Sequence, residues 1–248
     1  SINPNCRRGV VQVSSETDWV AKLDVNGLQS NTKYVYAFLN GEKSSDVGIT
    51  KTAPSENEDV AELRYAVFSC SDFAMGYFHA YDIGSTIENL DIWIHVGDYI
   101  YEDPVSDPVT ARERQILPTT DTVTLQEYRL RHAVHLHGDE GLRFLRRSVP
   151  LIASWDDHET ADNSWEFGAK DHDPVTDGDW GVRANNAFQA YMEWLPIRHH
   201  PGTMGLVTLG SFTQIIEWGN LATIITFDTR LSHRSREPTI NDTGNSVP

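Results

Sequence analysis

The sequence predicts an α/β domain with layered β-sheets flanked by helices, preceded by a small all-β unit. Residues 10–53 contain short runs of alternating polar and apolar residues and no helical period. From residue 61 onward, apolar strand patterns alternate with helical patterns, which is typical of layered α/β proteins. A short polar, acidic stretch separates the two textures. We therefore divide the chain into a β unit (1–54), a linker (55–60) and an α/β domain (61–248).

The composition fits a folded protein without a nucleic-acid-binding surface. Hydrophobic residues make up 39% of the 248 residues, which is enough for a core. The formal net charge is −16, whereas neutralising a phosphate backbone requires clustered Lys and Arg. No stretch approaches the ~18–20 apolar residues of a membrane span, and we recognise no signal peptide.

The first unit contains three runs whose alternation predicts strands, at residues 9–13, 19–25 and 33–39. Turn dipeptides such as Asn40-Gly41 punctuate these runs. We expect a small antiparallel β-sandwich that lacks its first strands.

The second unit contains three apolar runs that predict buried strands, at residues 63–69, 90–96 and 150–155. The spacing predicts a short helix over 77–83 and a longer helix over 124–137, which opens with a capping-box pattern. Asp139 is expected to cap the next helix, which ends before Pro150.

The last part of the chain predicts one helix and one hairpin. Residues 179–195 carry an amphipathic helical pattern. The strand runs at 212–217 and 221–227 flank Gly219-Asn220, which is a hairpin signal.

The turn after the second strand of the α/β domain carries the first candidate ligands. Asp98 follows Gly97, and a carboxylate at this position can bridge two cations. Tyr101 can supply a phenolate to a highly charged ion such as Fe³⁺, which such a ligand needs because the free phenol titrates near pH ~10. The alternative is a tight turn with Tyr101 packed against the sheet.

The turn after the third strand contains four consecutive ionisable residues, 156–159. Burying them requires a metal or hydrogen bonds as compensation. Asp157 is a candidate ligand of a second cation, and His158 a candidate proton donor to the substrate. The alternative is a solvated turn in which Asp156 or Asp157 caps a helix.

Two other groups have rival interpretations. The only cysteines are Cys6 and Cys70, so they could form at most one disulfide; Cys70 follows the first strand, and its alternative role is a small buried hydrophobe. The segment 135–139, together with His132, resembles the His-x-His-x-Asp core of metallo-β-lactamase-type zinc hydrolases. That core follows a strand, whereas this segment follows a helical pattern and has Glu140 in place of the last histidine, so surface histidines are the default.

The strand-end segments resemble those of the PhoD-like alkaline phosphatases. The order and spacing match over roughly residues 60–230, and the segment ending at Pro54 resembles the N-terminal fibronectin-like domain of that family. The matching motifs are Phe68-Ser69-Cys70-Ser71-Asp72, His95-Val96-Gly97-Asp98-Tyr99-Ile100-Tyr101-Glu102 and Trp155-Asp156-Asp157-His158-Glu159, supported by residues 128–129, 178–180 and 191–198.

The resemblance implies a calcineurin-like metallophosphatase fold with a multinuclear site at the strand ends. It implies Fe³⁺ bound by Cys70, Asp98 and Tyr101, with Asp98 bridging to Ca²⁺. Asp157 takes a position where related phosphatases often carry an Asn ligand, and it is expected to bind Ca²⁺. His158 corresponds to the histidine that stabilises the phosphoryl group or the leaving oxygen.

The resemblance also implies an activity and a location. The family hydrolyses phosphomonoesters and phosphodiesters, so small phosphoesters or phospholipids are the expected partners, and we expect a metal-bound hydroxide or oxide to attack phosphorus. One alternative is a phospholipase D-type phosphodiesterase on the same scaffold. The other is an inactive fragment, because the family's downstream Gly-Asp-x-His ligand segment does not occur after Arg230. Members of the family are typically exported by the twin-arginine route, so the resemblance implies a secreted, periplasmic or cell-wall location.

Overall fold

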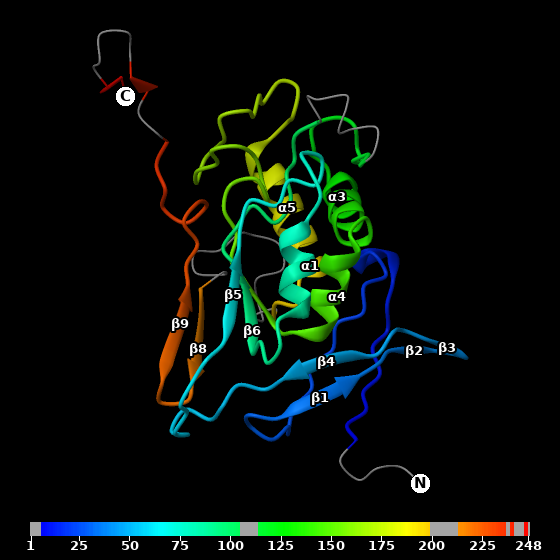
Figure 1. Ribbon diagram of the computed structural model, residues 1–248. Coiled ribbons are helices and arrows are strands. Elements are labelled where there is room, and N and C mark those ends of the chain that lie inside the picture. Colours follow the sequence, from blue (N-terminus) through cyan, green and yellow to red (C-terminus); the bar gives the residue numbers. More distant parts are fainter. Residues whose placement is uncertain (1–5, 105–113, 199–212, 237–238, 241–245, 248) are drawn as a thin grey trace.

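A parallel three-stranded sheet lies at the centre of the α/β domain (Figure 1). Its strands are β5 (Tyr65–Phe68), β6 (Ile92–His95) and β7 (Leu151–Ala153), in the order β5-β6-β7. The three predicted strand positions are confirmed, although each strand is shorter than its apolar run. The computed structural model describes residues 6–104, 114–198, 213–236, 239–240 and 246–247.

Helices cover one face of this sheet (Figure 1). They are α1 (His79–Thr86), α3 (Leu125–His137), α4 (Glu140–Ser148) and α5 (Trp180–Trp194). The predicted capping box opens α3, because the Thr124 and Glu127 side chains bond reciprocally to each other's backbone N–H groups. Asp139 caps α4 as expected, and Asp179 caps α5 by accepting from Val182 N–H, whereas α1 begins two residues later than its pattern predicts.

The two faces of the sheet form two separate apolar cores. On the helical face, Trp93 of β6 is completely buried among residues of α1 and α4, including Tyr81, Leu142 and Leu145. On the other face, Ile92 and Ile152 pack against Trp218. Trp218 belongs to the antiparallel hairpin of β8 (Gln214–Trp218) and β9 (Ala222–Thr226). This confirms the predicted hairpin; residue 212, where its first run starts, lies outside the described residues.

The N-terminal unit contains two pairs of antiparallel strands. β1 (Lys33–Tyr36) pairs with β4 (Gly48–Lys51), and β2 (Leu39–Asn40) pairs with β3 (Lys43–Ser44). The expected strands at 9–13 and 19–25 are wrong, and the fibronectin-like sandwich stays a prediction.

The reason is that the segment before β1 docks on helix α5 instead of pairing as a strand. Trp19 has a φ of 59°, which is incompatible with extended backbone. Lys22 donates to the backbone oxygens of Met192 and Ile197, the latter at 2.7 Å, and Trp194 Nε1 donates to Asp18 at 3.1 Å. The segment therefore contacts a helix where the pattern predicted a neighbouring strand.

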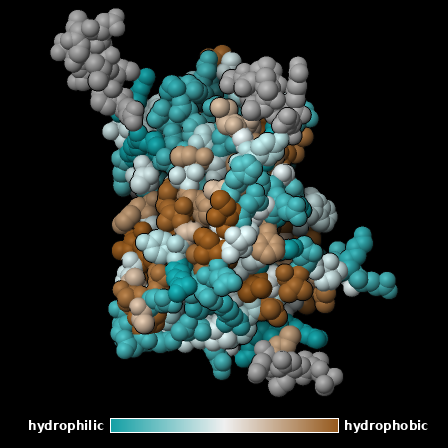
Figure 2. Space-filling model, viewed as in Figure 1, coloured by the Kyte–Doolittle hydropathy of each residue, from teal (hydrophilic) through white to brown (hydrophobic). Residues whose placement is uncertain are grey.

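β10 (Thr239–Ile240) pairs with β11 (Ser246–Val247) near the C-terminal end of the chain. Apolar side chains gather across the middle of the face shown in Figure 2, over the sheet and α1. Val67 of β5 and Ile83 of α1 are each more than half exposed. Within the described ranges, every helix is too short or too polar to cross a membrane.

Candidate metal centre

The three predicted site segments meet at the carboxyl ends of the parallel strands. Cys70 follows β5, Asp98 follows β6, and the 156–159 turn follows β7. Parallel strands present these ends at one edge of the sheet, where loops converge. Backbone hydrogen bonds fasten the first two turns together, from Cys70 N–H to Gly97 O at 3.2 Å and from Ser71 N–H to Asp98 O at 2.9 Å.

A glycine allows the β6 turn to approach the β7 turn. Gly97 has a φ of 120°, and a Cβ there would lie 2.5 Å from the backbone nitrogen of Asp156. A side chain therefore cannot fit without moving the backbone. Cys70 and Asp98 also have left-handed backbones, with φ of 53° and 54°. Such conformations are uncommon outside glycine and concentrate at functional sites.

Two of the predicted ligands converge on one carboxylate oxygen of a third. Asp98 Oδ2 accepts hydrogen bonds from Cys70 Sγ at 3.5 Å and from the Tyr101 hydroxyl at 3.3 Å. Cys70 is exposed and unpaired, so the buried-hydrophobe interpretation is wrong, and no disulfide joins it to Cys6. The hydroxyl of Tyr101 is directed to the carboxylate, which contradicts simple packing against the sheet.

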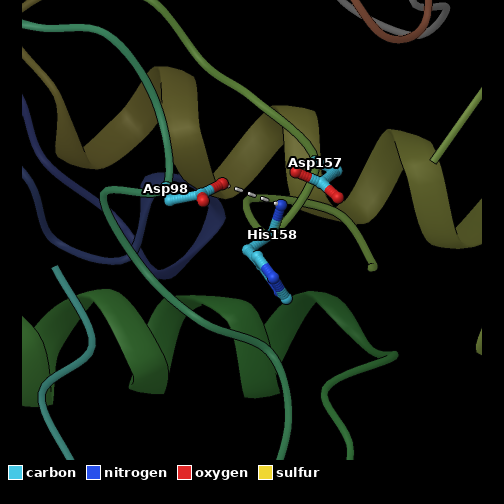
Figure 3. A group of neighbouring side chains, drawn as sticks. All are labelled: Asp98, Asp157 and His158. Carbon is cyan, nitrogen blue, oxygen red and sulfur yellow. Dashed lines mark hydrogen bonds between the residues drawn. The ribbon is translucent and has the colours of Figure 1, made fainter. Parts of the chain in front are cut away.

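Asp157 and His158 complete the cluster from the neighbouring turn (Figure 3). Asp98, Asp157 and His158 each offer a ligand atom within 4.8 Å of the others. The His158 backbone N–H donates to Asp98 Oδ1 at 3.4 Å, which is the dashed line in Figure 3. Asp157 is only 4% exposed and accepts from Asn163 N–H at 2.5 Å. The solvated-turn alternative is therefore wrong for Asp157.

The electrostatics of this cluster suit a cation. Burial raises the pKa of Asp98, and the charges of Asp157 and Asp156 add to the increase, against the opposing effect of His158. Burial, followed by the charges of Asp98 and Cys70, raises the pKa of Tyr101. A bound cation reverses this effect by favouring the anionic form of every donor. The Asp98 carboxylate, with a phenol and a thiol on one of its oxygens, therefore fits a metal site.

The contact between Glu102 and His158 was not predicted from the sequence. This residue is completely buried, and its Oε2 lies 2.8 Å from Nδ1 of His158. Burial lowers the pKa of His158, but the hydrogen bond to Glu102 and the charges of Glu102, Asp98 and Asp157 outweigh it and raise the pKa to about 9. Glu102, Asp103 and His158 also lie close enough together to form a second possible ligand group.

Arg230 is the second residue that sequence reasoning missed. Its Nη2 lies 2.9 Å from Asp156 Oδ2 and 3.1 Å from Asp157 Oδ1, while its Nε bonds to Asp156 Oδ1. Asp228 braces this arrangement by accepting from Arg230 N–H at 2.9 Å. A guanidinium ion therefore compensates the two aspartates of the third turn. The only sequence signal was an isolated Asp-Thr-Arg stretch at 228–230.

Glu159 links the two acidic turns instead of facing the cluster. It is completely buried and accepts from Tyr99 N–H at 2.6 Å and from Asp156 N–H at 2.8 Å. Burial is the main cause that raises its pKa to about 8. Glu159 thus holds the turns at their separation.

The rival histidine cluster lies inside the helical core. His132 and His135 are 1% and 2% exposed, so the surface default is wrong for both, although His137 is exposed. Burial lowers the pKa of His132 to about 3 and that of His135 well below its ordinary value. In the part of the chain that the structure describes, both groups with metal-ligand geometry contain His158 and neither includes these histidines. The zinc alternative is therefore unsupported.

Comparisons with known proteins give matches over most of the chain. The sequence model of the PhoD-like phosphatase family matches residues 65–246, and that of the PhoD-like phosphatase N-terminal domain matches residues 1–54. The chain is 31% identical to alkaline phosphatase D of Bacillus subtilis (strain 168) over 98% of its length, and it spans 40% of that relative.

Structural comparison gives a consistent result. The solved structure of PhoD matches with a TM-score of 0.82 and 30% identity, over 93% of this chain and 43% of that one. Purple acid phosphatase PPD1 from yellow lupin matches with a TM-score of 0.41 and 16% identity, over 77% of this chain and 29% of that one, and supports no conclusion.

Proposed function

The chain belongs to the PhoD-like phosphatase family, and from that premise we propose that it hydrolyses phosphoesters with the help of bound cations. The observation that carries the proposal is the convergence of Cys70 and Tyr101 on Asp98 Oδ2, beside Asp157 and His158. The thiol and the phenol both lie on one buried carboxylate, and both are strong ligands once deprotonated.

We assign Fe³⁺ and Ca²⁺ to this site. Cys70, Asp98 and Tyr101 would hold the iron, since thiolate and phenolate need a highly charged ion to lose their protons at neutral pH. Asp98 and Asp157 would hold calcium, which takes oxygen ligands. When bound, these cations supply Lewis-acid catalysis and lower the pKa of a water molecule.

The side chains around the cations have separate tasks. His158 donates a proton to the leaving oxygen of the ester, a role that its contact with the buried Glu102 carboxylate supports because an anionic neighbour favours the protonated ring. Arg230 offsets the charge of Asp156 and Asp157, so that an anionic phosphoryl group approaches a less negative surface.

The finer assignments are also proposals. We propose phosphomonoesters as the main substrates with diesters also cleaved; phospholipase D-type hydrolysis would use the same residues. The two family matches, at 1–54 and 65–246, support a division into an N-terminal domain (1–54), a linker (55–60) and a catalytic domain (61–248). A location outside the cytoplasm follows from the resemblance alone.

The test measures metal content and hydrolysis on the chain itself. Elemental analysis should find iron and calcium, and the chain should hydrolyse 4-nitrophenyl phosphate and, more slowly, bis(4-nitrophenyl) phosphate. Asp98→Asn should lose iron and reduce turnover by at least about 100-fold, since ligand loss removes the cation that supplies the chemistry. Asp46→Asn, at an exposed aspartate, is the matched control. Unchanged iron content and turnover in Asp98→Asn would overturn the assignment.

A further inference from the structure

We propose that Glu102 is a positioning residue that fixes the orientation and the proton of the His158 ring. The contact joins two different turns, since Glu102 follows β6 and His158 follows β7. The turn that carries Asp98 and Tyr101 therefore also supplies the residue that orients the candidate proton donor. This inference rests on the proposed function only for its effect on catalysis.

The hydrogen bonds of Glu102 determine which nitrogen of His158 carries the proton when the ring is neutral. Glu102 Oε1 accepts from Asp162 N–H at 2.5 Å, and this backbone group can only donate. Oε2 lies 2.8 Å from His158 Nδ1. An ionised carboxylate only accepts, so Nδ1 must carry a proton. Nε2 is then the nitrogen that remains for the substrate.

The buried charge of Glu102 has nearby compensation. Arg131 and Arg183 interact with it electrostatically, and both guanidinium groups are buried. A buried carboxylate with two cationic neighbours and two hydrogen bonds does not carry the cost of an isolated charge. Glu102 can therefore act as an acceptor inside the domain.

The backbone of Glu102 is also fixed in place. Its carbonyl oxygen accepts from Thr122 N–H at 3.1 Å and from the Thr122 hydroxyl at 3.0 Å. Arg131 Nη1 donates to the carbonyl oxygens on either side, at 2.7 Å to Tyr101 and 2.9 Å to Asp103. On the other side of the contact, the His158 ring lies 4.2 Å from the Tyr101 ring centroid at an interplanar angle of 30°. Orientation of His158 is thus imposed by a rigid carboxylate and an aromatic face.

Glu102→Gln separates positioning from packing because it keeps the size and removes one acceptor. The amide oxygen would take the Asp162 N–H, which leaves the NH₂ group facing Nδ1. Nδ1 must then accept, and the proton of the neutral ring moves to Nε2. A merely structural role would not change the tautomer.

The first test is spectroscopic and needs no activity. Two-bond ¹H–¹⁵N spectra of the full chain, labelled at histidine and recorded at a pH where the ring is neutral, report the tautomer, with His158→Gln providing the assignment. The wild type should show Nδ1–H, and Glu102→Gln should show Nε2–H. An Nε2–H tautomer in the wild type, or an unchanged tautomer in Glu102→Gln, overturns the proposal. If Glu102→Gln fails to fold, the wild-type spectrum alone decides.

The second test is kinetic. Glu102→Gln should lower kcat by about 10- to 100-fold for an alkyl phosphate and by less for 4-nitrophenyl phosphate, whose leaving oxygen needs little protonation. Metal content should stay unchanged, and Glu62→Gln, at an exposed glutamate, is the control. Adding Glu102→Gln to His158→Gln should cause no further loss. Additive losses overturn the proposal, whereas an inactive wild type with the expected tautomers contradicts the proposed function alone.

Discussion

Acid should destabilise this protein through three histidines buried near the metal-centre turns. His95 of β6 and His132 and His135 of α3 are at most 2% exposed, and all three pack around the Tyr99 ring. Burial lowers the pKa of His95 and of His132 to about 3, and that of His135 well below its ordinary value. Arg114 and Arg146 also act on His135, as would either of the other two histidines once protonated. They favour its neutral form.

The sign and size of the effect follow from proton linkage. The native pKa is lower than the unfolded value of 6.5, so the unfolded state binds more protons once the pH falls below 6.5. The stability that the neutral histidines contribute is therefore fully present above that pH, and it is lost as the pH falls toward about 3. At pH ~5.5, each histidine shifts the folding equilibrium by about tenfold, and the three together by about 1,000-fold, or about 4 kcal/mol.

The assay is urea unfolding at a series of pH values between about 4.5 and 7.5. His132→Leu removes one titrating group. As the pH falls by one unit, the folding equilibrium constant of this variant should therefore decrease by about tenfold less than that of the wild type. Glu159, whose pKa is raised to about 8, contributes the opposite slope, but equally in both proteins. His79→Gln, at an exposed histidine, is the control and should keep the wild-type slope. Parallel slopes for wild type and His132→Leu would refute the reasoning.

Three other substitutions test the local structure. Gly97→Ala should lower the melting temperature and the metal content, because its Cβ would lie 2.5 Å from the Asp156 nitrogen; a wild-type melting curve would contradict this. Thr124→Ala removes the α3 cap and should cost about 1 kcal/mol in urea unfolding with turnover unchanged, and no loss of stability would show that the cap is dispensable. Arg129→Met removes the ion-pair partner of the buried Glu193 and should cost about 3–5 kcal/mol. Adding Glu193→Leu should recover most of that loss, and a double variant as unstable as the single one would contradict the argument.

Sequence alone predicted the features that local chemistry determines. The caps of α3 and α4 and the Gly219-Asn220 hairpin depend on residues a few positions apart, and all three were placed correctly. The three turns of the candidate site were also predicted, because each follows an apolar strand of a parallel sheet. Its proposed ligands therefore come together in the fold as expected.

Long-range contacts account for what the sequence missed. Glu102 lies 56 positions from His158, and Arg230 lies 74 positions from Asp156, so neither pairing has a local signature. The expected strand at 19–25 failed because Lys22 reaches carbonyl groups about 170 positions away. His132 appeared to be a surface residue because its helix lacks a clear apolar face, yet α3 packs against both α4 and α5.

Iron K-edge X-ray absorption on the iron-loaded chain tests the proposed metal centre most directly. The exposed Cys70 thiol, held on Asp98 Oδ2 at 3.5 Å, is the assignment that distinguishes this site from an ordinary acidic turn. We predict one sulfur scatterer among oxygen ligands, which disappears in Cys70→Ser but stays in Cys6→Ser. An iron environment without sulfur, or one that Cys70→Ser leaves unchanged, would contradict the account.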